Sequence, residues 1–563
     1  MKQLFLFLFA LPLLLFAQNP KQANQAVVTI TTFDQQGNPI QQSLGFIHQR
    51  DNRIVAPFAP FKGAARAEVT NWQGQKDNVS RTLGASSLHD VFVSRLDRSL
   101  PKATVLRSAP QAVQRGTMGL LQTSKIEGKT SAPEATAIAT VEQDGALSYY
   151  TLTTPNEARY FGTPVLTARG EVFGMVQRNL LQGAITACAI DIAAADSLRI
   201  GSTSAFNADL NAIAMPKAIP TDTPKESYTY IYMVSRSAQD STLVATALND
   251  FVAAYPDNAV VYGDAATFYA NRGDFASADA WLQRGLAKGG DNRAVLYDTQ
   301  STLIYTFAAQ GRPERYPAWN FEAALDAARN AYAVSPQPAY AQQQGFALYA
   351  LKRYPEALEQ FQRVNASAIA SPRSFLYAAN TLEQMEGDHR AARLAMLDSA
   401  LNRCVKPYNA DAIAPLYARA QLLTEMGQYR QAVADYTDYE KVLGRDNLTA
   451  YFYYLRSQVE VQTRMFQQAI DDLSTAISLA RTPAEWEGYK VEQALLYLQV
   501  VHFDEAIAVA REVVARNADN ADAHKVLGVA YGEKKQKKLA QQHLKRAAEL
   551  GDENAVQLMK KYK

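Results

Sequence analysis

Hydrophobic and polar positions follow two different periods along this chain. Between residues 26 and 192, short apolar stretches separated by glycine-containing turns predict β-strands. From residue 228 onward, apolar positions follow the period of an amphipathic helix, with almost no β-branched runs. The chain is therefore expected to hold an all-β part followed by an all-α part.

The segment between these parts, residues 203–227, has a different composition. Pro216, Pro220 and Pro224 occur close together, with Ser, Thr, Asn and Asp around them. Proline and small polar residues interrupt regular structure, so the segment is expected to be a linker.

An uninterrupted apolar run from Leu4 to Phe16 follows one lysine at the start of the chain. The run has the length of a signal-peptide core and is too short to span a bilayer. We expect residues 1–17 to form a signal peptide, cleaved after Ala17. No cysteine follows directly after the run, so a lipoprotein anchor is not expected. No other stretch is long and apolar enough to cross a membrane. The mature protein is thus expected to be exported, to the periplasm or beyond, without a membrane span.

The helical part repeats itself at a spacing near 34 residues. Small residues mark the repeat, because an alanine on the second helix lets two helix backbones approach closely. The repeated alanines are Ala278, Ala324, Ala357, Ala392, Ala432, Ala469, Ala506 and Ala540. Twelve residues upstream another small residue recurs, as in Gly345, Ala420 and Gly528, with Asn380 as the exception.

This pattern resembles that of tetratricopeptide repeats. The resemblance covers residues 228–563 and implies a solenoid of about eight or nine helical hairpins, of which Tyr228–Tyr255 is a first, atypical one. In such solenoids the first helices line a concave groove, and the family pattern places two residues of each repeat there. The expected partner-binding residues are Gln342, Phe346, Tyr377, Thr381, Tyr417, Gln421, Tyr454 and Gln458. Tyrosines and amides suit an extended peptide, although these tyrosines could instead only cover helix packing seams.

The β part contains the segment RYFGTPVLTARGEVFGMV at residues 159–176. It resembles the nucleophile segment of trypsin-like serine proteases of the HtrA type, G-N/D-S-G-G-P-V followed by a turn and G-x-V-x-G. Gly162, Pro164 and Gly174 fit the pattern, whereas Phe161 stands at the position of the catalytic serine.

Further segments extend the resemblance over residues 25–202. Gly45, Phe46 and Ile47 fit the family's first strands, and residues 187–192 fit its closing strand. The pattern places Ala59 at the histidine position and Asp90 at the aspartate position. The expected fold is a multidomain chain, an N-terminal all-β trypsin-like double barrel followed by a C-terminal all-α tetratricopeptide solenoid.

A phenyl ring cannot attack a carbonyl, and a methyl group cannot transfer a proton. In working triads the loss of the serine or histidine alone lowers turnover by about 10⁶. The glycine-containing pair that would let backbone N–H groups face an oxyanion is replaced by Arg159 and Tyr160. These substitutions predict a pseudoprotease, with no catalytic residue. The alternative is an active peptidase with a rearranged site, using Thr163 or Ser148 as nucleophile.

Charge and composition exclude several other functions. The chain carries 57 basic and 55 acidic residues, which argues against nucleic acid as the main partner. Cys188 and Cys404 fall in different predicted domains, so no disulfide is expected, and the six histidines show no metal-binding spacing. No metal or cofactor is expected.

The sequence therefore predicts an exported, non-enzymatic interaction protein. The solenoid would bind a partner protein or peptide, and the pseudoprotease domain would be a second docking module, since it could accept a peptide strand at a sheet edge. A third possibility is a scaffold of an outer-membrane or secretion complex. A scaffold would bind one large complex in fixed stoichiometry, whereas a chaperone-like protein would bind many partners loosely.

Overall fold

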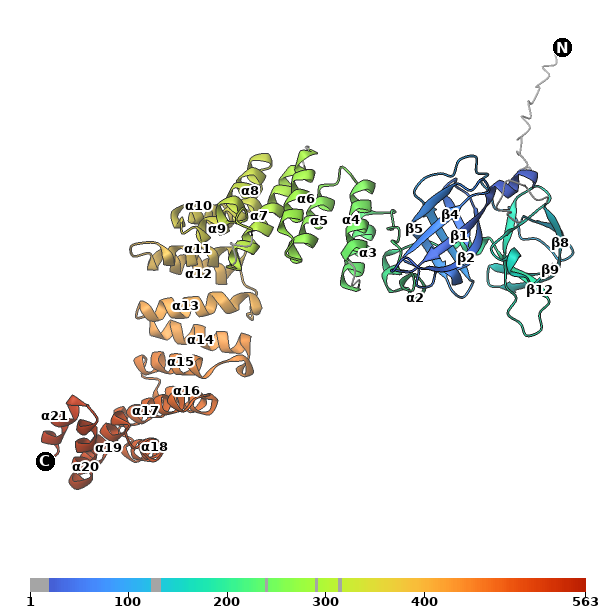
Figure 1. Ribbon diagram of the computed structural model, residues 1–563. Coiled ribbons are helices and arrows are strands. Elements are labelled where there is room, and N and C mark those ends of the chain that lie inside the picture. The colour runs from blue at the N-terminus through green and yellow to red at the C-terminus, as the bar shows by residue number, and fades with distance from the viewer. Residues whose placement is uncertain (1–19, 123–132, 238–240, 289–291, 312–315) are drawn as a thin grey trace, which may run out of the picture. The chain divides into compact units, whose positions relative to one another are not determined.

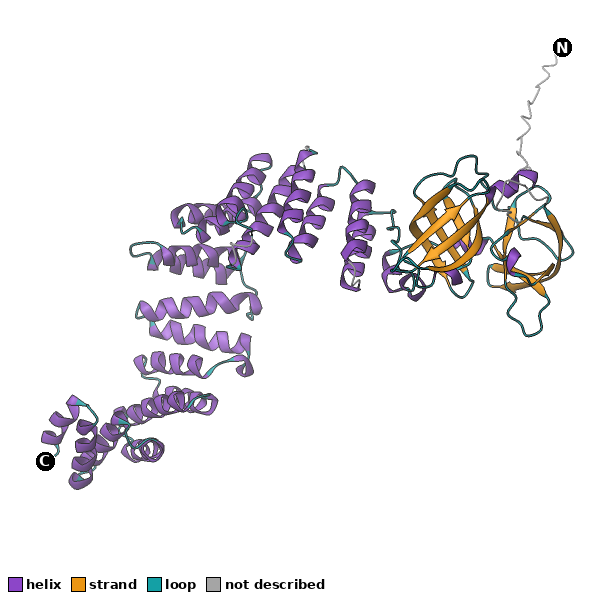
Figure 2. Ribbon diagram, in the orientation of Figure 1, coloured by secondary structure: helices purple, strands orange, loops and turns teal. Residues whose placement is uncertain are grey.

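The computed structural model describes residues 20–122, 133–237, 241–288, 292–311 and 316–563. The predicted signal peptide, residues 1–17, lies outside these ranges. The chain divides into two compact units, Met1–Ala265 and Ala266–Lys563, and each is described by itself. Among the described residues, all strands lie in the first unit and the second unit is helical (Figure 2).

Six strands of the first unit form a closed antiparallel barrel in the order β1–β2–β3–β6–β5–β4 (Figure 1). Side chains in β5 largely alternate between buried and exposed, as expected when one face of a strand lines a barrel interior. In the core, the rings of Phe61 and Phe92 stack at a centroid distance of 3.6 Å. The strands are β1 (Val27–Phe33), β2 (Pro39–Ile47), β3 (Arg53–Ala56), β4 (Arg66–Thr70), β5 (Lys76–Ser86) and β6 (Val91–Leu96).

The next six strands form a second closed barrel, in the order β10–β11–β12–β9–β8–β7. Its core includes an edge-to-face pair, Tyr150 and Phe173, with centroids 5.3 Å apart. A separate apolar cluster joins Phe46 and Val93 of the first barrel to Met175 and Ile190 of the second. The strands are β7 (Met118–Leu121), β8 (Glu134–Asp144), β9 (Leu147–Pro155), β10 (Pro164–Leu166), β11 (Val172–Gln177) and β12 (Thr186–Asp191).

The predicted linker, residues 203–227, lies wholly within the first unit. Residues 202–219, called the strap below, contain the short helices η4 (Ser202–Phe206) and α2 (Ala208–Asn211). The strap is hydrogen-bonded to the first barrel through pairs such as Ala214 N–H to Ala64 O and Thr82 N–H to Pro216 O, at 2.8 and 2.9 Å. Its apolar side chains, among them Leu210, Ile213 and Met215, are buried. The proline-containing segment is therefore held in place, because the strap bonds to the barrel and its apolar side chains are buried, and Pro224 begins the helix that follows.

Two helices of the first unit follow the strap, α3 (Pro224–Ser237) and α4 (Ser241–Ala254). Arg81 of β5 donates two hydrogen bonds to the Asp250 carboxylate of α4, from Nε at 2.6 Å and from Nη2 at 2.8 Å. This contact raises the pKa of Arg81 above its usual value, although burial opposes the shift. The two-point ion pair therefore fixes α4 against the first barrel.

The second unit is a series of antiparallel helical hairpins in which each helix packs on its neighbours along the chain. It is a repeat-like all-α region, as predicted. Helix α5 (Ala259–Asn271) contains the division between the units. The helices that follow are α6 (Phe275–Ala287), α7 (Arg293–Ala309), α8 (Phe321–Val334), α9 (Pro338–Ala350), α10 (Tyr354–Asn365), α11 (Pro372–Gln384), α12 (Arg390–Asn402), α13 (Ile413–Glu425), α14 (Tyr429–Leu443), α15 (Ala450–Gln462), α16 (Phe466–Leu479), α17 (Pro483–Gln499), α18 (Phe503–Arg516), α19 (Ala521–Glu533), α20 (Lys537–Glu549) and α21 (Glu553–Lys561).

Seven of the eight alanines that mark the sequence repeat are fully buried, and Ala392 is the exception. Five residues separate α11 from α12, where three separate α9 from α10 and α13 from α14. The two extra residues shift the packing register. Ala379 replaces Asn380 as the small buried residue of the first helix, and Arg393 replaces Ala392 as the buried residue of the second. The predicted anchor at Ala392 is therefore wrong by one position.

No helix among the described residues is long and apolar enough to cross a membrane. Both cysteines are free thiols. Within the described ranges, no group of three or more His, Cys, Asp or Glu side chains is placed to hold a metal ion.

Candidate functional site

The structure brings together two of the three positions where the protease resemblance expects catalysis. Ala59 begins the short helix η2 (Ala59–Phe61) after β3, and Asp90 lies in the turn between β5 and β6. The backbone N–H of Ala59 donates to Asp90 Oδ1 at 2.9 Å. Burial raises the pKa of Asp90, while the backbone N–H groups of Ala59 and Phe58 act in the opposite direction. In a working triad this carboxylate would orient the imidazole of the histidine. Here it accepts a hydrogen bond from the backbone of Ala59 instead.

Asp90 lies where the two barrels meet. Gln177 of β11, in the second barrel, donates through Nε2 to the carbonyl of Asp90 at 3.2 Å. The neighbouring His89 has its Nδ1 2.6 Å from the hydroxyl of Tyr149, on β9 of the second barrel. These contacts connect the β5–β6 turn of the first barrel to the sheet of the second.

Phe161, at the position of the nucleophile, follows the short helix η3 (Ala158–Tyr160). Its ring packs half-buried against the core of the second barrel. The backbone N–H of Phe161 donates to the carbonyl of Ala158 at 3.2 Å, and that of Tyr160 donates to Glu157 at 3.1 Å. These donors close the turn internally, so neither points toward a site where an acyl oxygen could bind.

Gly162, next to Phe161, is required by the junction between barrels. Its φ is +82°, a conformation that favours glycine, and an added Cβ would lie 2.2 Å from the carbonyl oxygen of Leu44 in the first barrel. The most recognisable glycine of the nucleophile segment is therefore explained by backbone conformation and by close approach of the two barrels.

The alternative nucleophiles suggested by the sequence are both inaccessible. Thr163 is fully buried and its hydroxyl donates to the carbonyl of Tyr160 at 2.6 Å. Ser148 is 1% exposed and accepts a hydrogen bond from Gln143 at 2.9 Å. Both hydroxyls are buried and form local hydrogen bonds, which argues against either of them as the nucleophile.

A different serine, histidine and aspartate meet elsewhere in the first unit. His48 directly follows β2, Ser108 lies between β6 and β7, and Asp196 lies in the short helix α1 (Ala193–Ser197). His48 Nε2 is 2.8 Å from Asp196 Oδ1 and 3.3 Å from Ser108 Oγ. The Ser108 hydroxyl donates to Asp196 Oδ2 at 2.6 Å.

The geometry of this second group differs from that of a catalytic triad, in which the serine and the carboxylate contact opposite nitrogens of the imidazole. Burial raises the pKa of Asp196, but hydrogen bonds from His48 and Ser108 and the charge of Arg53 outweigh it, and the net pKa is below its usual value. An ionised carboxylate only accepts, so Nε2 of His48 carries the proton in this contact. That nitrogen therefore cannot also receive the proton of Ser108.

The remaining nitrogen of the same ring, His48 Nδ1, is buried without a hydrogen-bond partner in the described part of the chain. The His48 side chain is itself fully buried. Sequence reasoning missed this group because His48 and Asp196 are separated by 148 residues. No short motif signals a contact of that range, and the barrels must close before the two side chains meet.

The predicted partner-binding tyrosines of the second unit are half-buried and each contacts other rings. Tyr377 meets Phe346 of the preceding hairpin edge to face at 4.8 Å. Tyr417 lies 5.2 Å from Tyr439, and Tyr454 lies 5.4 Å from Tyr489 of the next hairpin. The rings therefore cover packing seams between helices and leave part of their surface open to solvent.

Among the predicted amide and hydroxyl positions, Gln342 and Gln458 are half-buried and Gln421 is exposed. Thr381 is fully buried, and its hydroxyl donates to the carbonyl of Tyr377 at 2.7 Å. Because its side chain is buried and bonded within α11, Thr381 offers no surface to a partner in the groove.

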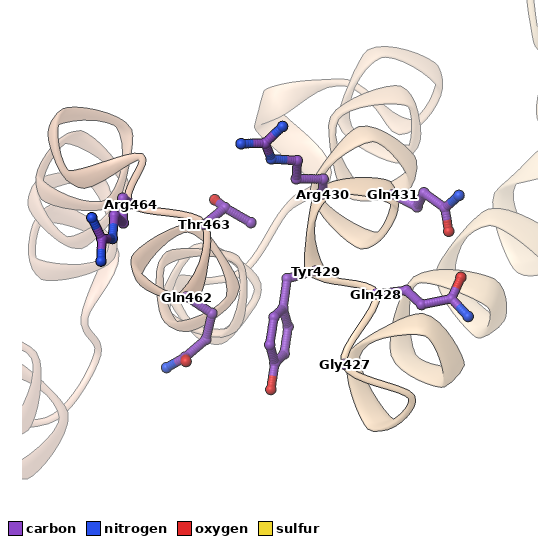
Figure 3. A pocket seen from close by; sticks show the side chains of 8 residues that line it. All are labelled: Gly427, Gln428, Tyr429, Arg430, Gln431, Gln462, Thr463 and Arg464. Carbon is purple, nitrogen blue, oxygen red and sulfur yellow. The ribbon is translucent and has the colours of Figure 1, made fainter.

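A polar pocket of about 560 Å³ in the second unit is lined by residues of the α13–α14 turn and of the α15–α16 turn, which belong to two successive hairpins. Figure 3 shows the ring of Tyr429 between the side chains of Gln428 and Gln462, with Arg430 pointing away from the ring. The lining residues are Gly427, Gln428, Tyr429, Arg430, Gln431, Gln462, Thr463 and Arg464. Tyr429 alone among them offers a large apolar surface, so this pocket lacks the apolar floor of a typical small-molecule site.

No family model and no curated protein matches this chain. Among solved structures, the serine endoprotease from Yersinia pestis is 16% identical with a TM-score of 0.27, over 31% of this chain and 62% of that chain. The inactive, serine-to-alanine form of Rv3671c from M. tuberculosis H37Rv is 16% identical with a TM-score of 0.26, over 34% of this chain and 93% of that one. The active form of the Rv3671c protease from M. tuberculosis is 16% identical with a TM-score of 0.26, over 31% of this chain and 79% of that chain.

The chain thus spans less than two thirds of the first of these proteases. Two closed six-stranded antiparallel barrels in succession form a trypsin-like double barrel, and a repeat-like all-α region follows it.

Proposed function

We propose that this protein is an exported, non-enzymatic interaction protein, with a pseudoprotease domain followed by tetratricopeptide repeats that bind a partner protein or peptide. The observation that carries the proposal is the state of the nucleophile segment. Phe161 has no nucleophilic atom, and its backbone N–H, which would face an oxyanion, donates to Ala158. Asp90 binds the backbone of Ala59.

The repeat region supplies the binding surface in this proposal. The buried alanines recur at the spacing of tetratricopeptide hairpins. Tyr377, Tyr417 and Tyr454 present partly open rings on the first helices of three hairpins. Such rings provide contact area with little loss of side-chain entropy, which suits an extended peptide.

Binding through these rings is tested by replacing Tyr377, Tyr417 and Tyr454 together with alanine. Partners recovered from an envelope extract by the parent protein should be lost with this variant, while its circular dichroism remains helical. A matched control replaces Tyr332, Tyr354 and Tyr429, which lie on second helices and are also half-buried. If both variants recover the same partners as the parent, the groove proposal is refuted. One stoichiometric complex would indicate a scaffold, and many loosely bound proteins a chaperone-like role.

A second candidate function is serine hydrolysis through the pair formed by Ser108 and His48, whose Oγ and Nε2 are 3.3 Å apart. The shared use of Nε2 by Asp196 and the burial of His48 argue against it. The mature protein should leave fluorogenic peptides intact and should not react with a serine-directed phosphonate. Labelling that maps to Ser108, and that disappears in Ser108→Ala, would establish the hydrolase instead.

A further inference from the structure

A second pocket, of about 330 Å³, lies in the first unit between the strap and helices α3 and α4. The strap supplies Leu210, Ile213 and Lys217 to its lining, α3 supplies Tyr230 and Val234, and α4 supplies Leu243. Five of these six side chains offer apolar surface, and their polar groups are one amine and one phenol. Ser204 and Asn211 also line the pocket, where the Ser204 hydroxyl accepts from the N–H of Gly201 at 2.9 Å and the Asn211 amide donates to the carbonyl of Ala205 at 3.0 Å. Pockets of this size with apolar walls and a few polar groups are typical of small-molecule sites.

The walls of this pocket are fixed before any ligand binds. Backbone hydrogen bonds hold the strap to the first barrel on both sides of Lys217, from Thr82 N–H to Pro216 O and from Ala218 N–H to Thr82 O, each 2.9 Å. The two-point contact of Arg81 with Asp250 holds α4 to the same barrel. A preformed cavity loses little free energy to ordering when a ligand enters.

Lys217 is the unusual group in the pocket. Its Nζ donates to the backbone carbonyl of Ile213 at 2.5 Å, and no carboxylate of the described residues forms an ion pair with it. Burial disfavours its ammonium form and lowers its pKa to about 8. At neutral pH most of the side chains therefore still carry a charge, with N–H donors left over after the bond to Ile213.

A partly buried cation without a counter-ion is costly to the folded state, and an anion bound beside it would remove that cost. The phenol of Tyr230 lines the same cavity, and burial raises its pKa to about 12, so it remains a neutral hydrogen-bond donor. Apart from the Ser204 hydroxyl and the Asn211 amide, which already form local hydrogen bonds, the remaining walls offer contact with apolar groups. The ligand must then combine one anionic group with an apolar body.

We propose that this pocket binds a medium-chain monocarboxylate, with its carboxylate on Lys217 and its chain against Leu210, Val234 and Leu243. A single carboxylate matches the single ammonium, whereas a phosphate would bring a second charge for which the pocket has no partner. This site is independent of the groove proposed above, since its lining lies wholly within the first unit.

Isothermal titration of the mature protein with octanoate tests the proposal. We expect saturable binding of one octanoate per chain, weakened at least tenfold in Lys217→Met and unchanged in Lys225→Met, an exposed lysine at the start of α3. Octan-1-ol, which has the same chain without the charge, should bind at least tenfold more weakly than octanoate. Non-saturable uptake, or equal affinity of the parent and folded Lys217→Met, would overturn the proposal.

A measurement on the unmodified protein guards against misfolding of the lysine variant. Octanoate should slow acetylation of Lys217 by an amine-reactive reagent, followed by mass spectrometry, and leave the rate at Lys225 unchanged. Equal rates at Lys217 with and without octanoate would contradict occupation of this pocket.

Discussion

Arg456 of α15 and Asp472 of α16 form a two-point ion pair inside one hairpin, with Nε and Nη2 donating at 2.7 and 2.8 Å. The third donor, Nη1, reaches Glu440 of the preceding hairpin at 2.7 Å. Arg419 repeats this arrangement one hairpin earlier, with Asp435 and Asp398 as its partners. In each case one guanidinium joins the two helices of its own hairpin to the second helix of the hairpin before it.

Asp472→Asn should lower the free energy of unfolding of the second unit by about 1.5–3 kcal/mol, because it weakens two charge-assisted hydrogen bonds while Glu440 still compensates the guanidinium of Arg456. The neighbouring Asp471 is exposed, so Asp471→Asn is a matched control that should change stability by less than about 0.5 kcal/mol. Urea denaturation followed by circular dichroism measures both. Equal stability of the two variants would show that the pair contributes nothing beyond a surface contact.

Glu460 predicts a dependence of stability on pH. It is 4% exposed, its Oε2 has no hydrogen-bond partner among the described residues, and its pKa is raised to about 8. Burial is the main cause and the negative charge of Asp472 adds to it, while Arg456 opposes it. Between its unfolded pKa of about 4.3 and about 8, the folded state holds a proton that the unfolded state has lost.

The contribution of Glu460 to stability should therefore fall as pH rises from about 4.3 to about 8. Glu460→Gln resembles the protonated side chain and should flatten this slope, with its largest stabilisation relative to the parent above pH 8. Urea midpoints at pH 6 and pH 9 test the sign. A variant that is less stable than the parent at pH 9 would show that the ionised carboxylate is the stabilising form.

Sequence patterns predicted both fold classes, because barrel strands and helical hairpins each leave a local periodicity. The contact between Ala59 and Asp90 agrees with their placement by the protease resemblance, because each lies next to a strand whose pattern the sequence shows. Ala392 is wrong by one position because the connection between α11 and α12 is two residues longer, and the misfit of Asn380 in the repeat is the sequence signal of that change. The strap and the group around His48 could not be predicted, because their contacts form only when segments distant in sequence pack together.

At position 528 of α19, glycine is expected to give a more stable protein than alanine, even though glycine is a poor helix former. An added Cβ would lie 2.5 Å from Cγ of Leu544 on α20, so alanine would separate the two helices. Gly488 of α17 is a matched control, with nothing within 4 Å of its Cβ position. Gly528→Ala should lower stability by about 1–3 kcal/mol through overpacking, whereas Gly488→Ala should raise it by about 0.5–1 kcal/mol.

Thermal unfolding of the two glycine variants gives the comparison directly. Opposite shifts of the melting temperature are expected. If Gly528→Ala were as stable as the parent, the close approach of α19 and α20 would not depend on the missing side chain.

Restoring the side chains of a triad should not restore peptidase activity. The double variant Ala59→His and Phe161→Ser would place an imidazole near Asp90 and a hydroxyl at the nucleophile position, yet the backbone N–H at residue 161 would still donate to Ala158. Loss of one oxyanion donor alone lowers turnover by about 10²–10³, so chemically complete side chains would lack the stabilisation that their transition state needs. We expect kcat/KM on fluorogenic peptides to stay within tenfold of the parent.

The control adds Ser108→Ala to the double variant. Ser108 lies 3.3 Å from His48, so its removal excludes hydrolysis by this pair as a source of measured activity. A phosphonate adduct on the new serine would show that the turn at Ala158–Tyr160 opens when a substrate analogue binds.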